Sequence, residues 1–146
     1  SMARLNRRAA ERMVEAGAHA CTDITGYGLL GHALEMATAS DVRLRIAHRD
    51  VPHFPAALEL LARNIAPGGL GANRRAFGER TGFGEAVPEA WRDLLSDPQT
   101  SGGLLIAVPE ARAAQLIERL AVEGFTGAAV IGCVEQRKHG AWVTVE

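Results

Sequence analysis

The sequence predicts an α+β domain in which helices pack on a mixed or antiparallel sheet. Apolar residues recur at helical spacing in several segments, and other segments alternate or run apolar as strands do. The chain also closes with two strand-like segments around a short turn, which regular strand–helix repetition would not give. With 146 residues, 47% hydrophobic and 23% charged, it fits one domain over 1–146, and we set Ser1 and Met2 aside as a cloning remnant.

Five helices are expected from apolar residues three and four positions apart. Asn6 is placed to cap the first helix and Gly17 to end it, while Pro52 and Pro55 suit the start of the third. Gly124 closes the last. The apolar faces are Leu5, Ala9, Met13 and Ala16; Leu30, Ala33, Leu34 and Ala37; Phe54, Ala57, Leu58 and Leu61; Trp91, Leu94 and Leu95; and Ala113, Leu116, Ile117 and Leu120.

The expected strands differ in pattern. Val42–Ile46 alternates, so Val42, Leu44 and Ile46 should face the core and Arg43 and Arg45 the water. The continuous apolar run 104–108 indicates a central strand buried on both faces. Weaker signals mark strands at 18–23, 128–134 and 141–145, the last two joined by a hairpin turn at 138–140.

Residues 66–86 contain six glycines and few large apolar residues, which predicts a long loop. Such a loop in a compact domain tends to be functional or mobile. The stretch 64–69 within this region could be a lid or an ordinary exposed loop.

The net charge of −1 gives no global field that would attract nucleic acid or an anionic membrane. Arg4, Arg7, Arg8 and Arg12 are interpreted as one solvated face of the first helix. Cys21 and Cys133 have no metal-site spacing and are expected to be small buried residues. No apolar run reaches the roughly 18–20 residues of a membrane span, and no signal peptide is recognisable, so we expect a cytoplasmic protein.

The first segment that could carry chemistry is 21–32. Asp23 ends an expected strand, directly before a glycine turn that opens a helix, where backbone N–H groups can approach an anion. A carboxylate beside a phosphate is useful when Mg²⁺ lies between them. Asp23 is therefore a candidate Mg²⁺ ligand, and capping of the turn or helix is the alternative. His32 is interpreted as a polar helix residue, since one histidine without partners makes no metal site.

Gly26, Gly28 and Gly31 match the dinucleotide fingerprint in letters, but no convincing βαβ unit or downstream acid supports it. The second segment, 97–103, begins at Asp97 and offers acceptors, hydroxyls and glycines. It is either a site-lining loop or a turn rich in side-chain-to-backbone hydrogen bonds. Asp23 alone cannot hold Mg²⁺, which needs several oxygens, so the sequence indicates half of a site.

Three segments together resemble the selenophosphate synthetase (selenide, water dikinase) family. They are Thr-Asp-Ile-Thr-Gly-Tyr-Gly-Leu-Leu-Gly-His at 22–32, Asn-Ile-Ala-Pro-Gly-Gly at 64–69 with Asn73, and Leu-Ser-Asp-Pro-Gln-Thr-Ser-Gly-Gly-Leu-Leu at 95–105. They occur in the family's order, and the resemblance runs from about Leu5 to the end. Tyr27 stands where phenylalanine is more usual. The wider superfamily includes aminoimidazole ribonucleotide synthetase, whose C-terminal domain gives the fold that the resemblance implies.

The resemblance implies conversion of selenide, ATP and water to selenophosphate, AMP and phosphate, with Mg²⁺ as cofactor. It implies a partner N-terminal ATP-binding half, which supplies the reactive Cys or selenocysteine, a lysine and most metal-binding aspartates, and a homodimer. Asp23 corresponds to the one aspartate contributed by the C-terminal half. No catalytic residue is expected in this segment, because Cys21 lies outside the family's nucleophile motif, and no nucleotide-binding residue is assigned. The isolated domain is expected to be inactive.

Three other interpretations stay open at this point. The chain could be the C-terminal domain of another ATP-dependent synthetase or kinase of the superfamily. It could be a non-enzymatic module that binds a nucleotide or a protein. It could also serve mainly in dimer or interdomain contacts, because the apolar surface left without a partner domain would promote self-association.

Overall fold

The computed structural model describes residues 5–146, apart from the side chain of residue 79. Ser1, Met2 and Arg4 lie outside the described residues. The helices are α1 (Arg7–Glu15), α2 (Gly28–Ala39), α3 (Pro55–Ala62), α4 (Leu70–Phe77), α5 (Glu89–Ser96) and α6 (Glu110–Val122), with 3-10 turns η1 (His48–Asp50) and η2 (Gly78–Arg80). The strands are β1 (Ala20–Asp23), β2 (Val42–Ile46), β3 (Thr81–Phe83), β4 (Leu104–Ala107), β5 (Gly132–Gln136) and β6 (Val143–Val145).

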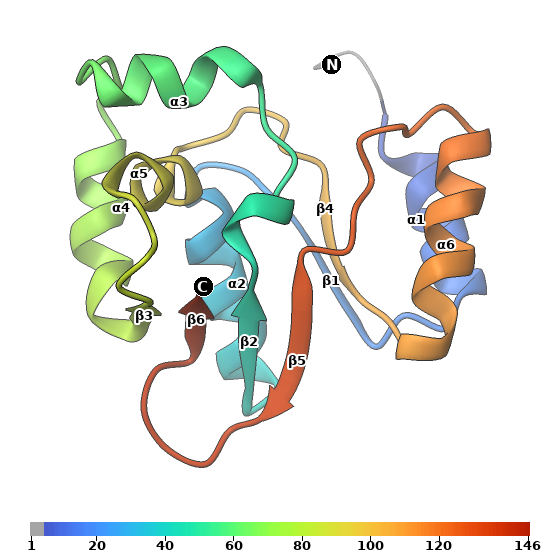
Figure 1. The fold of residues 1–146 in the computed structure, drawn as a ribbon. Coiled ribbons are helices and arrows are strands. Elements are labelled where there is room, and N and C mark those ends of the chain that lie inside the picture. Colours follow the sequence, from blue (N-terminus) through green and yellow to red (C-terminus); the bar gives the residue numbers. More distant parts are fainter. Residues whose placement is uncertain (1–4) are drawn as a thin grey trace.

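A four-stranded mixed sheet in the order β3-β6-β2-β5 forms the larger part of the fold (Figure 1). β6 is parallel to both β3 and β2, whereas β5 is antiparallel to β2. Helix α2 packs against β2 and β6, and α5 packs against α2. The main core lies between these elements: Leu30, Ala33, Leu34, Ala37, Leu44, Ile46, Val87, Leu95, Val143 and Val145. The expected α+β class, with helices on a mixed sheet, is confirmed.

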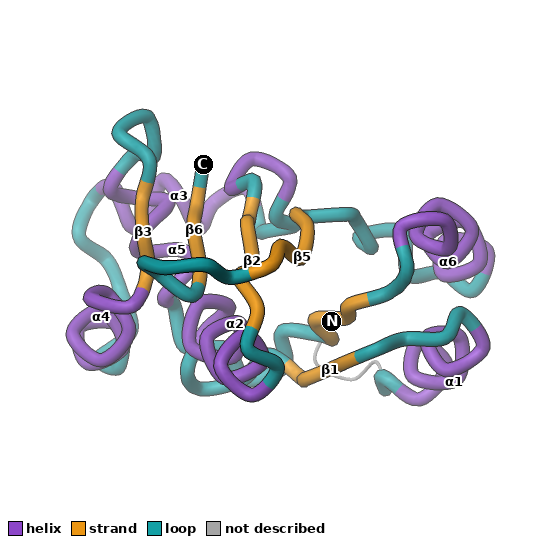
Figure 2. The backbone as a smooth tube through the Cα atoms, turned by 90° about the horizontal axis from the view of Figure 1, so that it is seen from below, coloured by secondary structure: helices purple, strands orange, loops and turns teal. Residues whose placement is uncertain are grey.

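A smaller unit stands beside this sheet. β1 and β4 form a two-stranded antiparallel ribbon that leads to the α1–α6 helix pair at one side of the molecule (Figures 1 and 2). Its own small core contains Ala9, Leu116 and Leu120. The chain passes from this ribbon directly to the part of the fold with the four-stranded sheet, because Asp23 at the end of β1 immediately precedes the turn into α2.

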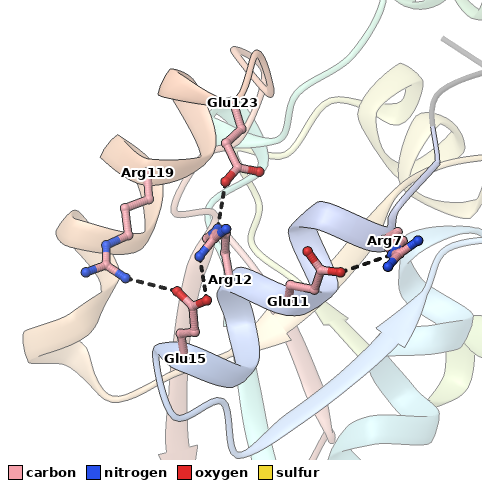
Figure 3. A network of polar contacts seen from close by, with 6 residues as sticks. All are labelled: Arg7, Glu11, Arg12, Glu15, Arg119 and Glu123. Carbon is pink, nitrogen blue, oxygen red and sulfur yellow. Dashed lines mark hydrogen bonds and ion pairs between the residues drawn. The ribbon is translucent and has the colours of Figure 1, made fainter.

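Charged side chains join α1 to α6 (Figure 3). Arg12 Nε lies 2.6 Å from Glu123 Oε1, and Arg119 Nη1 lies 3.2 Å from Glu15 Oε2. Hydrogen bonds from Arg12 to Glu15 and Glu123 raise the pKa of its guanidinium. Arg7 and Arg8 are exposed, as expected for a solvated face, but the Arg12 side chain is only 29% exposed because it joins α6.

The helix and strand patterns with the strongest periodicity are confirmed. All four apolar residues expected on the face of α2 are buried, and Leu44 and Ile46 point into the core from β2. Asn6 does occupy the position before α1, but its side chain makes no capping hydrogen bond. Phe54 precedes α3 and is 70% exposed, so it is not part of a buried face.

The prediction of a loop over residues 66–86 is wrong. This region contains α4, η2 and β3. Tertiary contacts explain the helix in spite of its glycine, because Leu70 and Asn73 are buried and Phe77 packs against the main core. β3 is one of the two edge strands of the four-stranded sheet, where it pairs with β6.

The hairpin expected around residues 138–140 is also wrong. β5 and β6 do not pair with each other, because β2 lies between them. β5 begins at Gly132 and not at 128, and β6 begins at Val143 and not at 141. The connection from β5 to β6 therefore passes β2 before β6 joins the sheet. β6 runs parallel to both of its neighbours, β2 and β3.

Two burial predictions need correction. β4 is not a central strand buried on both faces, because among the described residues it pairs only with β1 and all four of its residues are half-buried. Cys133 is exposed on β5, whereas Cys21 is half-buried. Of the helices in residues 5–146, none has the length and apolar character to cross a membrane.

Candidate functional site

Asp23 is the last residue of β1, where it pairs with Leu104 of β4. Its side chain is exposed, and no group in the described part of the chain donates a hydrogen bond to its carboxylate. The capping alternative is therefore not what the structure shows. The carboxylate is free to bind a ligand from outside this chain.

Backbone hydrogen bonds join the turn after Asp23 to the loop 97–103. Ile24 N–H donates to the Gly103 carbonyl at 2.8 Å, and Gly102 N–H donates to the Ile24 carbonyl at 3.0 Å. The Thr25 carbonyl accepts from Gln99 N–H at 3.0 Å. The first and third of the segments recognised in the sequence thus form one structural unit.

Gly28 brings this turn close to the end of α5. It opens α2 with a φ of +66°, and a Cβ built on it would lie 2.8 Å from the carbonyl oxygen of Asp97. Both the backbone conformation and the lack of space require glycine. Gly31, one turn later, leaves room for the ring of Phe77 of α4.

Asn73 brings in the second segment. Its side chain is 7% exposed, and Nδ2 donates to the carbonyl oxygens of Gly26 and Ser96, each at 2.9 Å. An amide group has two N–H donors, so one side chain satisfies both carbonyls. All three sequence segments therefore meet at one place, where α4 holds the turn before α2 and the end of α5.

His32 lies in the same region, as a polar residue of α2, and is 8% exposed. Nε2 lies 3.1 Å from Thr25 Oγ1, and Nδ1 lies 3.0 Å from Glu35 Oε2. The ring of Tyr27 covers it, with ring centres 5.4 Å apart. Nothing in the sequence signals this burial, because His32 falls between the apolar positions of α2.

Asp97 is the second carboxylate of the region. Oδ2 accepts a hydrogen bond from Gln99 Nε2 at 2.7 Å, but Oδ1 is buried without a partner. Burial raises the pKa of this carboxyl, and the Gln99 hydrogen bond partly opposes that shift. The loop 97–103 therefore makes the local hydrogen bonds expected of a turn, and its backbone also holds the turn that follows Asp23.

The stretch 64–69 is exposed throughout. Its last residue touches the third segment, because a Cβ on Gly69 would lie 2.9 Å from Pro98 Cγ. The glycines at 26, 28 and 31 do not open a dinucleotide-binding βαβ unit, because β1 pairs antiparallel with β4 and β2 belongs to the other sheet. Among the described residues, no three His, Cys, Asp or Glu side chains gather to hold a metal ion.

Fold and motifs together define a class of domain. The sequence matches, over residues 1–144, the family described as AIR synthase related protein, C-terminal domain, and the chain belongs to that family.

The similar curated proteins give a narrower result. The chain is 51% identical over 132 residues to the selenide, water dikinase of Pelobacter propionicus and 41% identical over 129 residues to that of Paraburkholderia xenovorans. It is 39% identical over 144 residues to selenide, water dikinase 2 of Peptoclostridium acidaminophilum. These alignments cover 90%, 88% and 99% of this chain but 38%, 36% and 41% of the relatives, so the chain spans well under half of their length. The resemblance found in the sequence is confirmed.

Proposed function

We propose that this chain is the C-terminal domain of a selenide, water dikinase, and that it contributes Asp23 to a Mg²⁺ site on the phosphates of ATP. The whole enzyme would convert selenide, ATP and water to selenophosphate, AMP and phosphate. The observation that carries the proposal is the exposed, unpaired carboxylate of Asp23 at the end of β1, beside the junction of the three segments.

The residues present fit part of a Mg²⁺ site. Mg²⁺ is often held by one or two carboxylates, with waters and substrate phosphates completing an octahedron. Asp23 supplies one carboxylate, and the described residues gather no further set of three ligands around it. The remaining protein ligands would come from another part of a longer polypeptide, as the greater length of the relatives suggests. The 146 residues alone are therefore expected to be inactive.

The backbone around Asp23 is held in place, which suits a ligand of a phosphate-bound cation. Phosphoryl transfer depends mainly on positioning and on neutralising charge around the phosphates. Asp23 lies on a paired strand, and hydrogen bonds from the loop 97–103 and from Asn73 fix the turn that follows it. A ligand held on a rigid frame loses little freedom when the cation binds.

The expected partners follow from the same proposal: an N-terminal ATP-binding half of the polypeptide, the substrates ATP and selenide, and a second copy in a homodimer. Both cysteines are free, which suits the reducing cytoplasm where we place the enzyme.

The first test is a Mg²⁺·ATP titration of the 15N-labelled chain followed by NMR, alone and then with the separately expressed N-terminal half. We expect amide shifts at residues 22–28 and 97–103 only when both halves are present. Tight, saturable binding by the 146 residues alone would contradict the proposal of a divided site.

The second test replaces Asp23 by Asn in the full-length polypeptide. We expect a loss of activity of at least about a hundredfold without a loss of stability, because one metal ligand is removed from an exposed position. Asp41→Asn is the matched control. Asp41 is exposed at the other end of α2, and its φ of +49° is one that asparagine adopts readily. Wild-type turnover in Asp23→Asn would rule out Asp23 as a ligand.

A further inference from the structure

The side chain of His32 contacts a carboxylate and a hydroxyl, which differ in whether they can donate a hydrogen bond. Nδ1 lies 3.0 Å from the Glu35 carboxylate, and Nε2 lies 3.1 Å from the Thr25 hydroxyl. The ring is buried under Tyr27, whereas the Glu35 side chain is 56% exposed at the surface. The contacts form a chain from the surface of α2, through a buried ring, to the turn beside Asp23.

The chemistry of these groups assigns the protons. An ionised carboxylate only accepts hydrogen bonds, so His32 Nδ1 must carry a hydrogen. In the neutral ring the other nitrogen, Nε2, then has a lone pair and accepts. In that tautomer the Thr25 hydroxyl would donate its single hydrogen to His32.

This assignment restricts what Thr25 can do toward a ligand. With its hydrogen directed to His32, Oγ1 has only lone pairs left to present. It can accept from a water molecule or face a cation, but it cannot donate to a phosphate oxygen. Its position is also fixed, because the Thr25 carbonyl accepts hydrogen bonds from Gly28 N–H and Gln99 N–H, both at 3.0 Å.

We propose that His32, oriented by Glu35, is a positioning residue that keeps the Thr25 hydroxyl an acceptor two residues from Asp23, so that this turn binds the hydration water of a cation and not a bare phosphate oxygen. The proposal rests on the proposed function, in which Asp23 is a Mg²⁺ ligand. Mg²⁺ keeps several of its waters in protein sites, and those waters are hydrogen-bond donors. An acceptor hydroxyl two residues along the chain from that carboxylate would match that donor shell.

A purely structural His32 would satisfy the same distances. It would stabilise the start of α2 and fix no property of a ligand site. The two roles differ in what Thr25→Val does, since valine keeps the shape of threonine and removes the hydroxyl. A structural role predicts a change in stability alone, whereas the positioning role predicts a change in Mg²⁺ dependence that Thr25→Ser avoids.

The tautomer of His32 can be measured on the 146-residue chain without metal, from long-range 1H–15N correlations of the histidine ring. We expect the neutral ring to carry its hydrogen on Nδ1 and to leave Nε2 bare. Glu35→Gln should release this preference, because a glutamine amide can also donate to Nδ1. Glu118→Gln, at an exposed position on α6, is the control that should leave the tautomer unchanged. Hydrogen on Nε2 of the neutral wild-type ring would overturn the inference.

The consequence for the cation is measured in the full-length polypeptide. Thr25→Val should raise the Mg²⁺ concentration for half-maximal rate about five- to tenfold, the effect of one lost hydrogen bond, while kcat at saturating Mg²⁺ changes little. Thr25→Ser should restore the wild-type Mg²⁺ dependence.

Asp23→Asn, run in parallel, separates the two proposals. If Asp23→Asn loses activity but Thr25→Val keeps wild-type Mg²⁺ dependence, the inference is wrong and the proposed function stands. If Asp23→Asn behaves as wild type, the cation site and the role of Thr25 are both wrong.

Discussion

The side-chain amide of Asn73 donates a hydrogen bond to the carbonyl oxygen of Gly26 across 2.9 Å, although the two residues are 47 positions apart. The same nitrogen donates to the Ser96 carbonyl. Asn73 lies on α4, Gly26 in the turn between β1 and α2, and Ser96 at the end of α5. One buried amide therefore fixes the relative position of three segments that surround the candidate site.

Replacing Asn73 by Leu should destabilise the chain by about 2–4 kcal/mol, because two carbonyls, one of them in a buried hydrogen bond, lose their donor. Urea unfolding followed by circular dichroism measures the change. Asn64→Asp is the control: Asn64 is exposed with a φ of +58°, which aspartate also tolerates, so a change within about 0.5 kcal/mol is expected. Equal stabilities for the two variants would show that the Asn73 bridge does not hold the segments together.

Gly28 and Gly17 allow the cost of a left-handed backbone to be measured apart from the cost of a steric clash. Both have positive φ, +66° and +72°, but a Cβ added at Gly28 would meet the backbone of Ser96 and Asp97, whereas one added at Gly17 would meet nothing within 4 Å. Gly17→Ala should cost about 1–2 kcal/mol, because alanine is strained in a left-handed conformation. Gly28→Ala should cost clearly more and should shift the amide resonances of residues 96–103. Similar losses in thermal unfolding would mean that the close approach at Gly28 relaxes easily.

Physical reasons explain which elements could be predicted from the sequence and which could not. Val42–Ile46 and the buried face of α2 were predictable because their periodicity reflects burial on one side. α4 is not predictable because Gly71 and Asn73 lower the local helix preference and the region has few large apolar residues, so the helix depends on contacts with α2 and α5. The hairpin error has a similar origin, since nothing local to residues 138–140 reveals that β2 separates β5 from β6.

The same limit applies to the site. Asp23 and the three segments were recognisable, because their residue types and order stand in the sequence itself. The bridges made by Asn73 and His32 were not, since each depends on which groups meet across the fold. A pattern along the chain gives the residue types of a site, whereas long-range packing gives its hydrogen bonds.

Asp97 should make stability depend on pH in a defined direction. Burial raises the pKa of its carboxyl in the folded chain, so the folded state binds this proton more tightly than the unfolded state does. The stabilisation from this proton is therefore present below the ordinary carboxyl pKa of about 4 and is lost as pH rises through the raised folded value. Urea unfolding of wild type and Asp97→Asn between about pH 4 and 7 tests this: the stability of wild type relative to the variant should grow toward acid. No change in the difference, or growth toward neutral pH, would contradict the assignment.

Cys21 offers a chemical reporter for Asp23. Its thiol pKa is raised, first by burial and second by the negative charge of Asp23. Because the thiolate is the reactive form and Cys21 is half-buried, Cys21 should be alkylated by iodoacetamide more slowly than the exposed Cys133. In a Cys133→Ser background, Asp23→Asn should then speed the alkylation of Cys21, since the neighbouring charge is gone, whereas Asp41→Asn should leave the rate unchanged. Mass spectrometry of the time course measures both rates. A rate for Cys21 that does not respond to Asp23→Asn would mean that burial alone controls this thiol, and that it cannot report on charge at the candidate cation site.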